Sequence, residues 1–218
     1  MRWLFLFLSL MTCSAHAEDK LEVVASFSIL GDLVHNIGGD RVKVSWIVGA
    51  NEDAHIYRPT PDTSKLILKA DLVFMNGFGF EGWMNRLVET SGYKGEIIVA
   101  TKGLKSPFVM DDSGNETPDP HTWLTIPQVK VYCQNIAQAL IDKDPEYKDL
   151  YKGNLTEYME KLDELDREIR ESLSQIPRNK RKVVTAHDAF GSFAREYEVD
   201  FSAPQGISTE SEASAKDM

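Results

Sequence analysis

Cysteine is almost absent from this 218-residue sequence, which contains only Cys13 and Cys133. Cys13 lies in an apolar N-terminal segment, so one cysteine remains in the rest of the chain. Neither a disulfide framework nor a cysteine-based metal site can form there. Cys133 occupies an apolar position of a predicted helix, where a small buried thiol is expected. The fold must therefore be held together by a hydrophobic core.

Basic residues are also in short supply, because 24 Lys and Arg stand against 34 Asp and Glu, a formal net charge of −10. Binding of nucleic acid requires clustered positive charge to neutralise phosphates, so we expect no nucleic-acid partner. The one basic run, residues 178–182, has no interleaved aromatic residue and is predicted to be a solvated loop before a strand. The remaining composition is that of an ordinary globular protein.

Long apolar runs are missing except at the N-terminus, where residues 3–11 follow Arg2 and precede a small-x-small cleavage pattern at 15–17. A permanent bilayer-spanning helix needs about 20 residues, so the run is too short for an anchor. We predict a cleaved secretory signal peptide over residues 1–17 and an exported, soluble product. Residues 10–13 weakly resemble a bacterial lipoprotein box, but the threonine before the cysteine is a poor match for the usual small residue.

From residue 21 onward, short apolar runs alternate with segments of helical periodicity. Strands are predicted at 21–26, 42–48, 71–76 and 96–100, and helices at 29–37, 63–70, 82–90 and 127–142. Alternating strands and helices give right-handed crossovers and a parallel sheet covered on both faces. Residues 18–143 are therefore predicted to form an N-terminal α/β lobe, with a polar loop over 110–120.

The segment 144–176 has the most distinctive pattern. Asp144 and Pro145 predict the start of a helix, as an N-cap residue and as a proline at the first helical position. Apolar residues then recur every three to four positions until Pro177, which cannot continue a helix. Such a helix would be about 45 Å long, with Gly153 as the position where it could bend or break. Both an ordinary amphipathic surface helix and a strut linking two lobes have this pattern.

A second α/β unit begins after Pro177, with a strand predicted at 182–186 and a helix at 189–197. The residues that remain are too few for a sheet covered on both faces. We therefore expect residues 177–218 to be the start of an incomplete C-terminal lobe. The predicted fold class is α/β, with two Rossmann-like lobes joined by the linking helix over 144–176.

Four histidines follow the leader, and three of them lie in loops or at strand ends. His35 falls within a predicted helix and is expected to be structural or exposed, whereas His55, His121 and His187 lie in the predicted loops. The crevice of an open α/β sheet lies at the carboxyl ends of its strands, where His55 and His187 fall. Imidazole is the commonest metal ligand, and nearby prolines stiffen two of the loops. We predict a metal site between the lobes, with Trp123 either excluding water there or packing in the core.

Five segments of the chain carry a recognisable combination of motifs. They are AHIYRPTPD (54–62), NGFGFEGW (76–83), DPHTWL (119–124), AHDAFG (186–191) and GISTESEAS (206–214). In this order they resemble the ZnuA-like and TroA-like family, the transition-metal solute-binding proteins of ABC importers. The resemblance covers essentially the whole chain after the leader. It implies two α/β lobes joined by one long helix, a metal ion in the cleft, and an ABC importer membrane permease as partner. We expect the exported protein to be a monomer in the periplasm.

By this resemblance His55, His121 and His187 occupy three metal-ligand positions, and the family's fourth ligand, usually an Asp, is expected beyond residue 218. Manganese-binding members commonly have Glu at the third position, where His187 stands here. Imidazole-rich sites suit zinc, although zinc importers often carry a His-rich loop before the second ligand and residues 102–118 contain no histidine. We expect Zn²⁺ as the transported ligand and Mn²⁺ as the alternative.

Two other functions fit parts of this pattern. A zinc-dependent hydrolase could use the three histidines together with Asp188 or Glu210 to activate water. No independent acid–base signature accompanies them, so we predict that the protein is not an enzyme and has no catalytic residues. A surface adhesin could use the same fold for contact with a host, and substitution of the metal ligands would leave that activity intact.

Overall fold

The computed structural model describes residues 19–110, 114–207 and 209. The predicted signal peptide, the lipoprotein-box match and Glu210 lie outside these residues, and the placement of the leader stays a prediction. Within the described residues, no helix combines the length and apolar character needed to cross a membrane.

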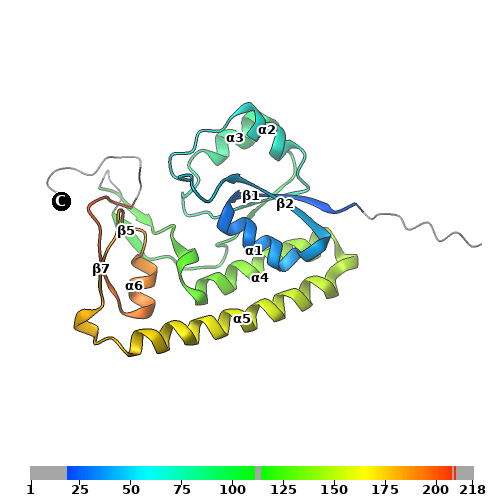
Figure 1. The fold of residues 1–218 in the computed structure, drawn as a ribbon. Coiled ribbons are helices and arrows are strands. Elements are labelled where there is room, and N and C mark those ends of the chain that lie inside the picture. Colours follow the sequence, from blue (N-terminus) through cyan, green and yellow to red (C-terminus); the bar gives the residue numbers. More distant parts are fainter. Residues whose placement is uncertain (1–18, 111–113, 208, 210–218) are drawn as a thin grey trace, which may run out of the picture.

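A four-stranded parallel sheet forms the centre of the N-terminal unit (Figure 1). Its strands are β1 (Leu21–Phe27), β2 (Val42–Val48), β3 (Leu72–Met75) and β4 (Glu96–Val99), in the order β2-β1-β3-β4. The connecting helices are α1 (Ser28–Gly38), α2 (Pro61–Leu68) and α3 (Met84–Ser91). Figure 1 shows α2 and α3 on one side of the sheet and α1 on the other, so the predicted parallel α/β arrangement is confirmed.

Helix α2 begins two residues earlier than predicted, at Pro61 rather than Thr63, because of a local cap. The Thr60 hydroxyl accepts a hydrogen bond from the Thr63 N–H at 3.3 Å, and Pro61 follows at the first helical position. This arrangement satisfies a free amide at the helix start, and proline loses nothing there because it has no N–H. The cap closes the loop that follows β2.

The core of the N-terminal unit lies between this sheet and the helices on its α1 side. Helix α4 (Ile126–Lys143) packs against α1 and buries its apolar face. Fully buried core side chains include Leu30, Ile37, Leu72, Phe74, Tyr132, Ile136 and Leu140. Each such side chain removed from water contributes about 1.5–3 kcal/mol, so the sheet and its helices form one stable unit. The prediction for Cys133 is confirmed, because its side chain has no exposed surface.

Residues 110–120 differ from the loop that their composition predicts. Strands β5 (Phe108–Met110) and β6 (Glu116–Pro118) pair as an antiparallel hairpin. Backbone pairing over three residues needs no alternating apolar pattern, which is why composition indicated only a loop. The end of the hairpin is fixed to the chain before it, since Asp119 N donates to Pro107 O at 2.9 Å and Ser106 Oγ donates to Asp119 O at 2.6 Å.

The long helix is present, and it follows a short 3₁₀ turn at Pro145–Tyr147. Helix α5 (Lys148–Ser174) has 27 residues, or about 40 Å of length, and Gly153 does not interrupt it. Asp144 does not cap this segment with its side chain. Its carboxylate Oδ2 instead accepts hydrogen bonds from Arg41 Nε at 2.7 Å and Tyr151 Oη at 2.9 Å. A charged partner at close range explains why the carboxylate is not available to the helix N-terminus.

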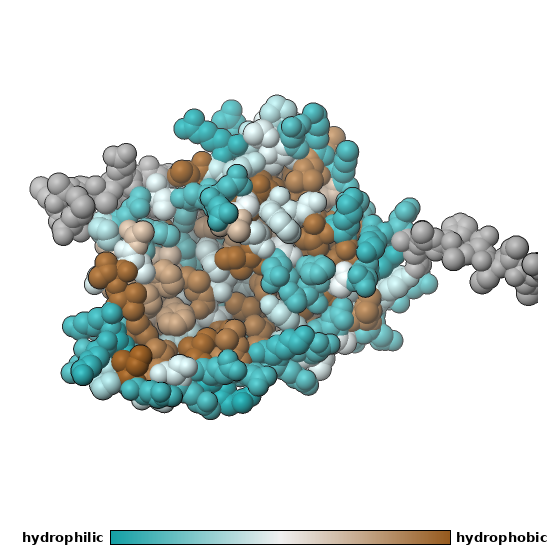
Figure 2. All heavy atoms as spheres, in the orientation of Figure 1, coloured by the Kyte–Doolittle hydropathy of each residue, from teal (hydrophilic) through white to brown (hydrophobic). Residues whose placement is uncertain are grey.

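The described C-terminal unit contains β7 (Lys182–Val184), α6 (Gly191–Tyr197) and β8 (Asp200–Ser202), with β7 and β8 paired in parallel. Figure 1 shows α5 running beneath both units, from α4 to the vicinity of α6. The basic run forms a 3₁₀ turn, Arg178–Lys180, where a loop was predicted. Apolar side chains gather on this part of the molecule in Figure 2, and Val184 on β7 is 81% exposed.

Candidate metal centre

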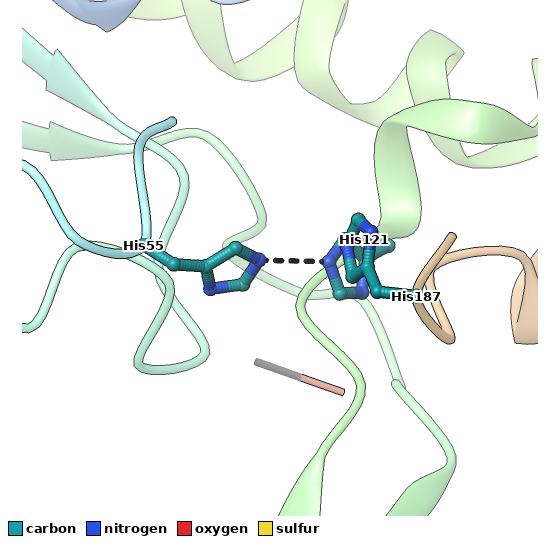
Figure 3. A group of neighbouring side chains, drawn as sticks. All are labelled: His55, His121 and His187. Carbon is teal, nitrogen blue, oxygen red and sulfur yellow. Dashed lines mark hydrogen bonds between the residues drawn. The ribbon is translucent and has the colours of Figure 1, made fainter. Parts of the chain in front are cut away.

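The fold brings the three predicted histidines together. His55 lies in the loop after β2, His121 lies between β6 and the short 3₁₀ helix Thr122–Leu124, and His187 lies between β7 and α6. One ring nitrogen from each lies within 4.8 Å of the other two. Figure 3 shows His55 approaching His121 from one side and His187 from the other. His35 is exposed on α1 and is not part of this group.

The spacing of the ring nitrogens suits a small divalent cation. His55 Nε2 and His121 Nε2 are 3.1 Å apart. A tetrahedral zinc ion with bonds of about 2.0–2.1 Å separates its ligand nitrogens by about 3.3 Å. His187 Nε2 is buried and has no hydrogen-bond partner among the described residues. A buried polar nitrogen without a partner costs free energy, and a bound cation would remove this cost, so the donor set fits a metal.

His121 is held in one orientation by the carboxylate two residues before it. Asp119 Oδ1 is 3.0 Å from both the backbone N and the ring Nδ1 of His121. Both residues are buried, with Asp119 0% and His121 1% exposed. A carboxylate acceptor keeps the proton on Nδ1, which leaves the Nε2 lone pair directed at His55 and available to a metal.

The loop carrying His55 has a carboxylate in the same position. Asp53 Oδ1 accepts from the His55 backbone N at 2.9 Å, and its Oδ2 accepts from Thr209 Oγ1 at 2.5 Å. Partial burial opposes ionisation of Asp53, but these two hydrogen bonds hold its pKa below the ordinary value. Burial, followed by repulsion from His121, lowers the pKa of His187. At neutral pH His187 is therefore an uncharged imidazole, the form that binds metal.

Aromatic rings form one wall of the cavity, whose volume is about 490 Å³. The Phe80 ring lies 4.8 Å from the His55 ring and 4.7 Å from the Trp123 ring, which lies 5.3 Å from His121. Trp123 also contacts Phe27, so it both borders the cavity and packs on the core. These rings displace water and strengthen electrostatic interactions at the histidines.

A buried polar network behind the cavity holds the peptide that precedes His121. Glu81, 4% exposed, accepts hydrogen bonds from Ser26 Oγ at 2.5 Å and Asn76 N at 2.6 Å. Asn76 Nδ2 in turn donates to the Pro120 carbonyl at 2.9 Å. Burial raises the pKa of Glu81, although these hydrogen bonds favour its charged form. The network fixes the chain on which His121 stands without entering the cavity.

Sequence reasoning identified the three histidines but not the roles of the two aspartates. Their signal was visible as a repeated Asp-x-His spacing, because Asp53 and Asp119 each precede a histidine by two residues. Asp188, named as a candidate carboxylate, is exposed and is not among the side chains grouped within 4.8 Å of one another. The structure therefore brings together imidazoles, with carboxylates behind them.

The similarity to known proteins extends over nearly the whole chain. A family described as "Zinc-uptake complex component A periplasmic" (ZnuA) matches residues 23–218. The manganese ABC transporter substrate-binding lipoprotein PsaA of Streptococcus anginosus is 35% identical over 99% of this chain and 74% of its own length. The PsaA of Streptococcus pneumoniae is 35% identical over 95% and 69%, respectively.

Solved structures agree with this result. The periplasmic zinc-binding protein TroA from Treponema pallidum superposes with a TM-score of 0.84 at 28% identity, covering 91% of this chain and 72% of that one. A manganese-bound periplasmic metal-binding protein from candidatus Liberibacter asiaticus gives a TM-score of 0.79 at 29% identity, covering 91% and 73%. This chain thus spans 69–74% of the length of these four proteins.

Proposed function

Because the chain belongs to the ZnuA family of periplasmic zinc-uptake components, we propose that it captures one Zn²⁺ ion between His55, His121 and His187 for delivery to an ABC importer permease. It is the extracytoplasmic binding component of a divalent-metal ABC transporter, and not an enzyme. The observation that carries the proposal is the convergence of three ring nitrogens within 4.8 Å, one of which is buried and has no hydrogen-bond partner in the described part of the chain.

The proposed preference for zinc rests on the ligand chemistry. All three grouped side chains are imidazoles, and neutral imidazole suits zinc better than it suits manganese, which favours oxygen ligands. Manganese is the second candidate, because the PsaA relatives carry that metal in their names. Competition between Zn²⁺ and Mn²⁺ for the purified protein decides between them, and tighter binding of manganese would overturn the zinc preference.

The domain organisation of the chain is part of the same proposal. Residues 18–143 would form one Rossmann-like lobe and residues 177–218 the start of a second, each presenting ligands to a cleft, with 144–176 as the linking helix. A rigid helical connector permits small tilts rather than wide closure, so metal loading should leave the overall shape nearly unchanged. Small-angle scattering of the metal-free and zinc-loaded protein measures this, and a large compaction would contradict it.

Export through a cleaved signal peptide over residues 1–17 completes the proposal. The periplasmic description of the family supports this location, and the PsaA relatives are named as lipoproteins, which leaves lipid attachment at Cys13 as the alternative. The mass of the exported protein distinguishes an N-terminus after Ala17 from a lipid-modified cysteine.

Alanine substitution tests the ligand assignment. Structural zinc sites bind with about 10–16 kcal/mol, so an equal share for each of three imidazoles is at least about 3 kcal/mol, or at least about 10²-fold in Kd. His55→Ala, His121→Ala and His187→Ala should each weaken zinc binding by about this factor in a chelator-competition titration. His35→Ala is the matched control, because His35 is exposed on α1. An equal loss in the control would refute the assignment.

A further inference from the structure

The two Asp-x-His units are built in the same way. In each, one carboxylate oxygen accepts the backbone N–H of the histidine two residues later, at 2.9 Å for Asp53 and His55 and at 3.0 Å for Asp119 and His121. This is the local turn that Asp side chains form with their own backbone. Both histidines of the N-terminal unit are therefore presented by a loop that its own aspartate holds.

The second oxygen of each carboxylate faces the C-terminal unit. Asp53 Oδ2 accepts from Thr209 Oγ1, 156 residues later in the sequence, at 2.5 Å. Asp119 Oδ2 lies 3.5 Å from Ser192 Oγ and 3.7 Å from Arg195 Nη2, both on α6. Each aspartate thus joins a histidine of one unit to a residue of the other.

We propose that Asp53 and Asp119 are positioning residues that couple the contact between the two units to the geometry of the metal site. One oxygen orients the histidine loop, and the other holds the C-terminal unit, which carries His187, at the distance the metal requires. Metal affinity then depends on Thr209 and on the start of α6, through their contacts with the two aspartates. This proposal rests on the proposed metal-binding function, but part of it can be tested without metal.

Asp119 has an additional effect that is independent of metal. Because its Oδ1 also lies 3.0 Å from His121 Nδ1, it keeps the proton there and leaves Nε2 bare. His55 Nε2, 3.1 Å from His121 Nε2, must then carry the proton of their shared hydrogen bond in the metal-free protein. The two rings therefore hold defined and different tautomers before any ion arrives.

Gly191 provides a steric test of the link through Asp119. A Cβ at Gly191 would lie 3.0 Å from Asp119 Oδ2, which is closer than ordinary contact. Gly191 begins α6 without a positive φ, so alanine is conformationally acceptable there. Gly153 on α5 is the matched control, because a Cβ at that position meets nothing within 4 Å. Any loss of zinc affinity that is specific to Gly191→Ala must therefore come from displaced neighbours.

Zinc titrations on the full chain form the first part of the experiment. Substitutions behind a metal-bound histidine typically cost about 10–100-fold in affinity, and we expect a loss in this range for Asp53→Asn and Asp119→Asn. Asp144→Asn is the matched control, a carboxylate 9% exposed whose partners are Arg41 and Tyr151. Thr209→Val, which replaces a hydroxyl with a methyl of equal size, should also weaken binding.

Gly191→Ala should lower zinc affinity and Gly153→Ala should leave it unchanged. Affinities of Asp53→Asn and Asp119→Asn equal to that of the unmodified protein would overturn the proposal. So would losses in the Asp144→Asn control as large as theirs.

NMR spectra of the metal-free protein form the second part of the experiment. They test the role of Asp119 separately from the proposed metal-binding function. Long-range proton–nitrogen correlations of the histidine rings report which nitrogen carries the proton. We expect His121 to be protonated at Nδ1 in the unmodified protein and to lose this preference in Asp119→Ala. An unchanged tautomer in that variant would overturn the role of Asp119, whether or not zinc binds. The expected tautomer in a protein that does not bind zinc would instead refute the proposed function alone.

Discussion

The hydroxyl of Tyr197 joins three helices, and its removal tests how the C-terminal unit is attached. Tyr197, 3% exposed on α6, donates to Asp166 Oδ1 on α5 at 2.8 Å. It also accepts from the backbone N of Ile126, the first residue of α4, at 3.3 Å. Burial, together with the bond to Asp166, raises the pKa of Tyr197 to about 12, so the hydroxyl remains a donor under all ordinary conditions.

Tyr197→Phe keeps the ring and removes only this hydroxyl. Asp166 retains Arg170 as a partner at 2.8 Å, so the larger cost is the buried Ile126 N–H that is left without an acceptor. An unsatisfied buried donor costs about 1–3 kcal/mol. In a protein of this size about 1 kcal/mol corresponds to about 2–4 °C, so the melting temperature should fall by about 2–12 °C.

Urea unfolding followed by circular dichroism measures the loss, and limited proteolysis locates it. Cleavage should increase first within residues 177–209, because these lose the hydroxyl contacts of Tyr197 with α4 and α5, while the ion pair between Arg170 and Glu196 remains. The double variant with Asp166→Asn should show a coupling of about 0.5–3 kcal/mol, as expected for residues in direct contact.

Tyr93→Phe is the matched control for the location of the effect. Its hydroxyl donates to the Glu96 carbonyl at 3.1 Å, and Tyr93 is 6% exposed in the N-terminal unit. This variant should lose stability without increased cleavage after residue 177. A Tyr197→Phe protein with the unfolding midpoint and cleavage pattern of the unmodified chain would refute the reasoning.

Further predictions concern the thiol, the pH dependence, the metal preference and a buried ion pair. Burial raises the pKa of Cys133 to about 12, so a thiol reagent should label it only in denaturant, as mass spectrometry would show. Burial, then repulsion from His121, lowers the pKa of His187 from 6.5, so the unfolded chain binds this proton more readily. The contribution of His187 to stability should therefore be constant above about pH 6.5 and should be lost as the pH falls below that value. Urea midpoints of the metal-free protein at several pH values measure this, and they should depend less on pH in His187→Gln. His187→Glu should shift preference toward manganese in metal competition, since a carboxylate oxygen replaces an imidazole. Asp144→Ala should lower the free energy of unfolding in urea by about 3 kcal/mol, because it removes the buried carboxylate that accepts from Arg41 Nε and Tyr151 Oη.

Helices and strands whose apolar residues follow a regular spacing could be predicted from the sequence. The strands β1 to β4 and helix α1 follow short apolar runs and helical spacing, and they form near the predicted residues. The stripe over 144–176 predicted α5, because a helix must bury one face whatever it packs against, and Tyr151 and Leu162 are buried on that face. The three histidines were found from their residue type and their place at loops and strand ends.

Contacts between distant residues were decided only by the tertiary structure. The carboxylate of Asp144 faces Arg41, 103 residues earlier, so a residue with an N-cap signature is an ion-pair partner instead. The same holds at the candidate metal centre, where Asp53 reaches Thr209 and Asp119 faces the start of α6. The spacing of apolar residues indicates which face of a helix or strand is buried, but not which polar group a given side chain will contact. That choice depends on how the loops of the two units meet, and only the folded chain determines it.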